Sequence, residues 1–90
     1  MESYAQLTRL LERLARHEQQ VLEPARRVLA LTEKGYAAGE LGLAELIDAT
    51  RAEWRASQQQ LDLLLEARVQ EADLRFAAGE RLAQAREASE

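Results

Sequence analysis

The sequence predicts an all-α protein that folds as one long antiparallel helical hairpin with coiled-coil-like packing. Three of its four glycines lie within eight residues, at positions 35, 39 and 42, with strongly helical sequence on both sides. The composition is 47% hydrophobic and 31% charged but only 4% aromatic, which is typical of long helices and coiled coils. The single proline is Pro24, and residues 43–78 contain neither glycine nor proline. These observations favour two long helices joined by a glycine-rich turn, in a single domain covering residues 1–90.

The first helix is expected to span about residues 4–38, because its hydrophobic residues recur in alternating steps of four and three. The predicted heptad positions are Leu7, Leu11, Leu14, Glu18, Val21, Ala25, Val28, Thr32 and Gly35. The apolar face is widened by Leu10, Leu22, Leu29 and Tyr36. A face this wide suits a helix with neighbours on two sides, as in a bundle or a barrel wall.

Pro24 is the one helix breaker inside this first helix. Proline has no amide hydrogen, and its ring clashes with the carbonyl four residues back. We expect the helix to kink near Glu23. The alternative is a clean break into two helices, with Pro24 at the first position of the second.

The predicted turn covers residues 39–42. Gly39 can take a positive φ without a Cβ clash, so it can stop the first helix near Ala38. The second helix can start at once, because Gly42 is an acceptable N-cap and Glu45 stands at the third helical position near the positive helix end.

The second helix is expected from about residue 43 to about residue 85. Its predicted heptad positions are Ile47, Thr50, Trp54, Ser57, Leu61, Leu65, Val69, Ala72, Phe76, Gly79 and Ala83. Two consecutive steps of four around Leu65 form a stutter, which straightens a supercoil locally. The string from Phe76 to Glu80 echoes the string from Tyr36 to Glu40, so an array of helical repeats is an alternative arrangement.

Charge and composition exclude several classes of function. A net charge of −4 with interleaved arginines and glutamates argues against nucleic-acid binding. The chain has no cysteine, and its only histidine, His17, is expected to be a surface or interface side chain. Glu45 and Asp48 have a spacing that could hold a metal, but two carboxylates alone make a weak site. We therefore expect no enzyme activity, no cofactor and no metal site.

The amino-acid sequence also shows no pattern typical of a targeting signal or a membrane-spanning segment. The N-terminus has no basic region followed by an apolar core, so no export signal is expected. No stretch approaches the roughly 20 apolar residues of a membrane-spanning helix, so no membrane contact is expected from this segment.

A tyrosine, a turn glycine and a helix start stand at a characteristic spacing around the turn. The string is Tyr36-x-x-Gly39-Glu40-x-Gly42-Leu43-x-Glu45-Leu46-Ile47-Asp48-Ala49-x-Arg51, preceded by Val21-Leu22-Glu23-Pro24-Ala25-Arg26. It resembles the periplasmic helical hairpin of the TolC-like outer-membrane efflux proteins, most closely their heavy-metal branch. The resemblance covers roughly residues 21–79.

The resemblance implies a place in a tripartite export system made of a pump, an adaptor and a duct. In such a duct, three copies form a helical barrel, and the residues matching Tyr36, Glu45 and Asp48 lie at its periplasmic entrance. The residues matching Ala38, Gly39, Glu40 and Leu41 form the tip that meets the periplasmic adaptor protein. The chain would then be a periplasmic fragment of a longer outer-membrane protein, and the cargo would be heavy-metal cations.

Self-association is expected because a two-helix hairpin of 90 residues cannot cover its own apolar faces. The resemblance implies a trimer for the parent duct, and a dimer or helical bundle is expected for the isolated chain. The residues expected to become buried on association are Leu11, Leu14, Val28, Trp54, Leu61 and Leu65. The alternative function is a free-standing soluble helical-bundle protein that serves as a structural or protein-interaction module.

Overall fold

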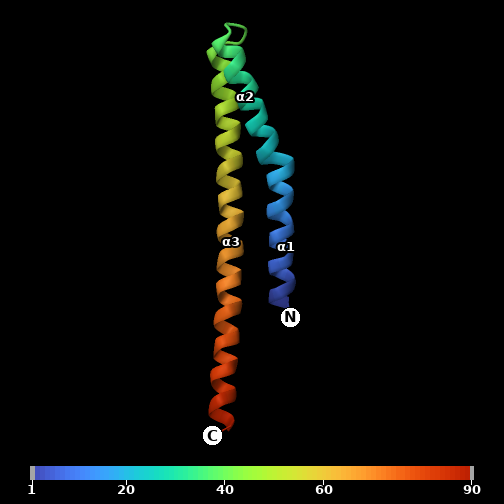
Figure 1. The fold of residues 1–90 in the computed structure, drawn as a ribbon, viewed down its shortest axis with the longest axis vertical. Helices are drawn as coiled ribbons and strands as arrows, with labels where there is room; N and C mark the ends of the chain where they lie inside the picture. The colour runs from blue at the N-terminus through green and yellow to red at the C-terminus, as the bar shows by residue number, and fades with distance from the viewer. Residues whose placement is uncertain (1, 90) are drawn as a thin grey trace.

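In a computed structural model that describes residues 2–89, the chain is a single helical hairpin (Figure 1). Helix α1 (Glu2–His17), a π-helical turn η1 (Glu18–Leu22) and helix α2 (Glu23–Ala37) form one arm, and helix α3 (Leu43–Ser89) forms the other. The hairpin measures 76 × 16 × 14 Å. Its radius of gyration of 21.1 Å far exceeds the roughly 12 Å of a compact domain of this length. The predicted all-α antiparallel hairpin is confirmed.

The two arms meet along a narrow contact that runs the length of α1 and α2. On the first arm, the residues turned toward α3 are Leu7, Leu10, Leu14, His17, Leu22, Ala25, Leu29 and Thr32. On α3, the matching residues are Leu46, Ala49, Glu53, Ala56, Gln60, Leu63, Ala67, Gln70 and Leu74. In the part of the chain that the structure describes, three of the four buried hydrophobic residues are alanines, so the helices approach closely. The buried hydroxyl of Thr32 donates to the carbonyl of Val28 at 2.7 Å.

The contact lies one residue away from much of the predicted heptad pattern. On the first arm, Leu10, Leu22 and Leu29 pack against α3, whereas the predicted Leu11, Val21 and Val28 are exposed. On α3, the predicted positions Ile47, Trp54, Leu61, Leu65, Val69 and Phe76 are all exposed. The predicted α3 heptad is therefore wrong as a description of the hairpin contact. Large residues dominate a sequence pattern, but close helix packing selects alanines and partly buried polar side chains instead.

The first arm kinks at η1 and does not break. The inward residues run 7, 10, 14 and 17, then resume at 22, 25, 29 and 32, so one extra residue stands between the two sets. A π-helical turn holds this extra residue, and the amide of Glu23 accordingly donates to the carbonyl of Glu18, five residues back. Pro24 follows directly and has no amide hydrogen to contribute. Figure 1 shows the arm changing direction between α1 and α2.

Candidate functional site

The tip of the hairpin is fixed by backbone hydrogen bonds. Gly39 adopts φ +77°, and its amide donates to the carbonyl of Tyr36 at 3.0 Å. The amide of Glu40 donates to the carbonyl of Gly35 at 2.8 Å, which completes a Schellman motif. The structure confirms that Gly39 stops the helix in the left-handed conformation, as the sequence predicted. The motif presents the four predicted tip residues, Ala38, Gly39, Glu40 and Leu41, in exposed positions at the end of the hairpin.

Leu41 is the tip residue that folds back onto the hairpin. Its amide donates to the carbonyl of Gly35 at 3.2 Å, and its side chain lies against the Cα of Gly35. A Cβ at position 35 would lie 2.6 Å from Leu41 Cδ1. Leu41 nevertheless keeps 39% of its surface exposed, so it offers an apolar contact beside the turn.

The predicted entrance residues lie near the tip but are not joined to one another. Glu45 Oε2 accepts a hydrogen bond from the amide of Gly42 at 3.0 Å, so this carboxylate caps its own helix. Asp48 follows almost one turn later on α3 and is exposed. Tyr36 is also exposed, and no hydrogen bond connects these three side chains within one chain. Of these three side chains, Glu45 is the one that makes a hydrogen bond within the hairpin.

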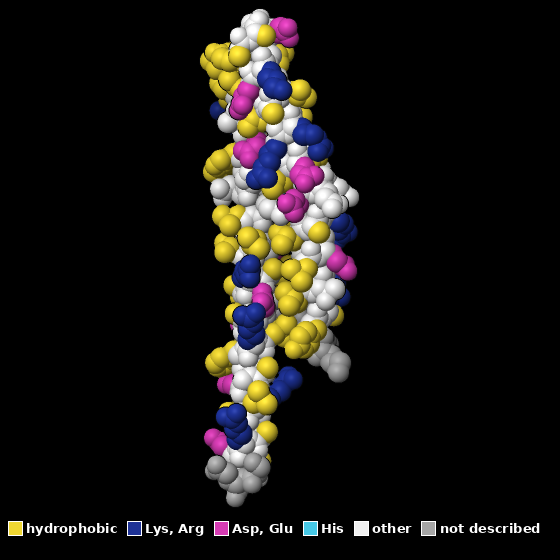
Figure 2. Space-filling view, viewed as in Figure 1, with side chains coloured by type: hydrophobic (Ala, Val, Ile, Leu, Met, Phe, Trp, Pro, Cys, Tyr) yellow, Lys and Arg dark blue, Asp and Glu magenta, His cyan; other side chains and the backbone are white. Residues whose placement is uncertain are grey.

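The side of α3 turned away from the first arm carries a row of large exposed hydrophobic residues. We call it the outer face of α3, and it consists of Ile47, Trp54, Leu61, Leu65, Val69 and Phe76. Trp54 keeps 63% of its surface exposed and Phe76 keeps 70%. In Figure 2, hydrophobic side chains also gather where α1 lies beside α3, with charged side chains around them. A helix with one packed face and a second exposed apolar face has room for another partner.

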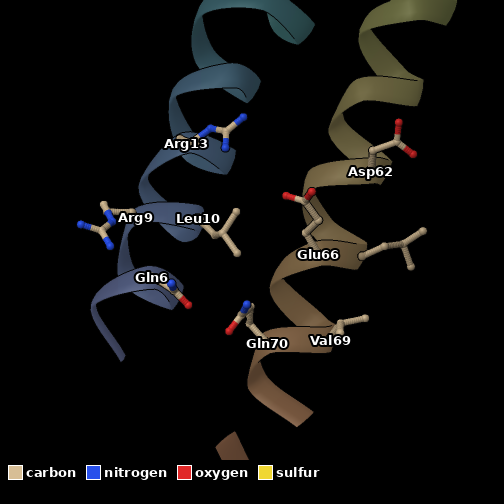
Figure 3. Close-up of a pocket in the computed structure, with 9 residues that line it drawn as sticks. Gln6, Arg9, Leu10, Arg13, Asp62, Glu66, Val69 and Gln70 are labelled. Atoms are coloured by element: carbon tan, nitrogen blue, oxygen red, sulfur yellow. The ribbon is translucent and has the colours of Figure 1, made fainter. Parts of the chain in front are cut away.

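A groove of about 900 Å³ lies between α1 and the middle of α3. Figure 3 shows Leu10 and Glu66 pointing toward the space between the two helices, with Gln6 and Gln70 facing each other at one end. The lining residues are Gln6, Arg9, Leu10, Arg13, Asp62, Leu65, Glu66, Val69 and Gln70.

His17 lies in a polar cluster within the helical contact. Its Nδ1 is 2.7 Å from Gln60 Oε1, and its Nε2 is 3.0 Å from Gln59 Oε1. Gln60 Nε2 in turn donates to the carbonyl of Leu14 at 3.5 Å. The hydrophobic pattern of the sequence did not indicate these glutamines, although the run Gln58–Gln60, of which Gln60 is half-buried, was a signal for polar contacts. The cluster aligns the two arms, because shifting either helix would leave these partly buried groups without partners.

Among residues 2–89, no three side chains of His, Cys, Asp or Glu come close enough to hold a metal ion together. Within the same range, no helix has the length and apolar character needed to cross a bilayer.

The chain was compared with known proteins at the levels of family, sequence and structure. No model of a protein family matches it, and neither a curated protein nor a solved structure is similar enough to count as a match.

Proposed function

We propose that this chain is a structural hairpin in the wall of a trimeric export duct of the TolC-like type. The observation that carries the proposal is the pair of faces on α3. One face packs on α1 and α2, while the outer face, from Ile47 to Phe76, remains exposed. A helix in a barrel wall needs a neighbour on each side, and α3 has an apolar face for each of them. The 76 Å length of the hairpin agrees with a wall element.

In this proposal the protein conducts substrates and performs no chemistry on them. Tyr36, Glu45 and Asp48 lie at the periplasmic entrance, where threefold repetition makes a ring of carboxylates. Such a ring favours cations, in keeping with heavy-metal cargo. The exposed residues Ala38–Leu41 form the contact with the periplasmic adaptor, and Leu41 supplies its apolar surface.

The entrance is tested on the longer duct protein that the proposal implies. Because Glu45 caps Gly42, replacing it with alanine would disturb the turn as well as the charge. The variant Glu45→Gln/Asp48→Asn removes both charges and keeps an oxygen acceptor at position 45. Single-channel recordings should then show weaker cation block and lower cation selectivity than the wild type.

A matched control separates the ring from a general charge effect. Glu80→Gln/Glu87→Gln removes the same charge from exposed positions near the far end of α3. It should leave conductance and block unchanged. If the Glu45/Asp48 variant also behaves like the wild type, the entrance role is wrong.

The second candidate is a free-standing helical-bundle protein that acts as a structural or interaction module. It is favoured by the closure of the hairpin through its own contacts, including the Schellman motif and the Glu45 cap. The intact mass of the protein made from its natural gene separates the two candidates. A mass well above 10.2 kDa supports the duct, whereas a mass equal to it supports the module.

A further inference from the structure

The groove between α1 and α3 has walls of opposite charge. Arg9 and Arg13 line it on α1, and Asp62 and Glu66 line it on α3. The ion pairs found in residues 2–89 join other groups, and none connects an arginine of α1 to a carboxylate of α3. Glu66 points into the space between the helices and Arg9 points away from α3 (Figure 3), so the charges of the two walls are unmatched across the groove.

Between these walls the groove is open, and its apolar floor is the half-buried Leu10. Leu65 and Val69 border the groove at the edge of the outer face of α3, where they keep 53% and 60% of their surfaces exposed, and Val69 points away from α1 (Figure 3). The whole chain exposes 7176 Å², compared with the roughly 5,300 Å² expected for a compact protein of 10.2 kDa. The difference is more than the roughly 800 Å² that each partner contributes to a stable protein–protein interface.

We propose that a second copy of this chain docks on the groove and forms a twofold four-helix bundle. The twofold axis runs parallel to the helices in front of the groove, so that α1 of each copy lies over α3 of the other. Arg9 and Arg13 line the same length of groove as Asp62 and Glu66, so they lie at the same height along the hairpin. The rotation keeps that height, and it brings each pair of arginines onto the partner's carboxylates.

A second copy fits this groove better than other partners because the groove is complementary to itself. A purely acidic or purely basic helix would match one wall and be repelled by the other. In the twofold pair, both walls are matched at once, and Leu10 of each copy lies between them. Every helix then lies antiparallel to its neighbours, and both turns lie at the same end. The pairing goes beyond the proposed duct and does not depend on it.

The test uses two charge-reversal variants of the 90-residue chain. The acidic variant is Arg9→Glu/Arg13→Glu, and the basic variant is Asp62→Arg/Glu66→Arg. The wild type should sediment at about twice 10.2 kDa at tens of micromolar. Each variant alone faces like charge across the twofold contact, so its dimer should be weaker by about tenfold or more.

Mixing the two variants distinguishes contacts between chains from contacts within a chain. In the mixed pair, glutamates at positions 9 and 13 face arginines at 62 and 66, and the unchanged walls also match. An equimolar mixture should therefore form the heterodimer, visible by native mass spectrometry as the mixed species. If the charges acted only across the groove of a single chain, mixing would restore nothing.

Matched controls protect the experiment from general effects of charge and folding. Arg68→Glu/Arg75→Glu makes the same charge change as the acidic variant, at exposed positions about 180–200° around α3 from Glu66. Both arginines pair with Glu71 of their own helix and do not line the groove, so this control should dimerise like the wild type.

Helicity by circular dichroism must match the wild type in every variant. If a reversal lowers it, Arg9→Gln/Arg13→Gln replaces the acidic variant, and its mixture with the basic variant should still pair preferentially. If the control variant has lower helicity than the wild type, Arg68→Gln/Arg75→Gln replaces it.

Three outcomes would overturn the proposal. They are a monomeric wild type at tens of micromolar, a dimer that is indifferent to the four groove charges, and variants whose mixture fails to form the heterodimer.

Discussion

The side chain of Leu41 occupies the space beside Gly35 in which any other residue would carry its Cβ. The Cδ1 atom of Leu41 lies 2.6 Å from that position, and its Cγ lies 2.9 Å away. Position 35 is helical, so glycine there costs helix stability but leaves room for the returning chain. This contact joins the last turn of α2 to Leu41, the residue with which the chain leaves the tip.

Replacing this glycine should therefore fail to stabilise the hairpin. An ordinary exposed Gly→Ala change in a helix gains about 0.5–1 kcal/mol. In Gly35→Ala, displacement of Leu41 should cancel that gain or turn it into a loss, as measured by urea unfolding at a fixed protein concentration.

The matched control for this prediction is Gly79→Ala, because no atom outside its own helix lies within 4 Å of a Cβ at that position. Gly79→Ala should show the full gain of about 0.5–1 kcal/mol in the free energy of unfolding. Adding Leu41→Ala to Gly35→Ala should restore the gain relative to Leu41→Ala alone. If Gly35→Ala and Gly79→Ala stabilise equally, Leu41 does not constrain the turn.

Gly39 should be sensitive for a different reason. Its φ of +77° is strained for residues with a side chain, although a Cβ there would touch nothing. Gly39→Ala should lower the free energy of unfolding by about 1–2 kcal/mol. Gly39→Asn should lose less, because asparagine tolerates this conformation better. Equal unfolding midpoints for wild type and Gly39→Ala would contradict the left-handed turn.

Ala56 should tolerate no larger side chain while the arms remain packed. It is 2% exposed, in the narrow contact between α3 and the first arm. Ala56→Leu should separate the helices and cost about 1–3 kcal/mol. The exposed Ala52 lies four residues away on the same helix, and Ala52→Leu should change stability by less than about 0.5 kcal/mol. Similar losses at both positions would contradict the observed packing.

The π-helical turn should be removable only together with the proline. Deleting Gln20 takes out the extra residue and lets the inward pattern run continuously from His17 to Leu22. It also forces Pro24 into an ordinary helix, at a cost of about 3 kcal/mol. The deletion alone should therefore destabilise, whereas the deletion combined with Pro24→Ala should match or exceed the wild type in thermal unfolding. Pro24→Ala alone should keep η1, because the extra residue remains.

Local chemistry made the turn predictable from the sequence. Gly39 could be recognised as the helix stop, and Glu45 as a residue of the first helical turn, since both depend on residues a few positions away. The kink at Pro24 was predictable for the same reason. Its π-helical form was not, because it arises from the mismatch between two inward patterns that only packing against α3 reveals.

The packed face of α3 was not predicted because it carries mostly small and polar side chains, whereas the exposed face carries large hydrophobic ones. Ala49, Ala56 and Ala67 fit the narrow contact, whereas Trp54 and Phe76 dominate the pattern read along the chain. The candidate entrance rests on the resemblance alone and stays a prediction. Within one chain, Glu45 serves the turn, and the grouping of Glu45 with Asp48 into a ring requires further copies.

Both arms run away from the turn, so the start of α1 and the end of α3 point in the same direction (Figure 1). A force that pulls these two ends apart would therefore peel α1 from α3 one helical turn at a time, as a zipper opens. Each step would break only a few of the contacts between the arms, and the π-helical turn at Glu18–Leu22 would be reached before the contact between α2 and α3. Such a hairpin has little resistance to tension at its ends. The hairpin would resist better a force that slides one arm along the other, because all contacts between the arms would then bear the force together.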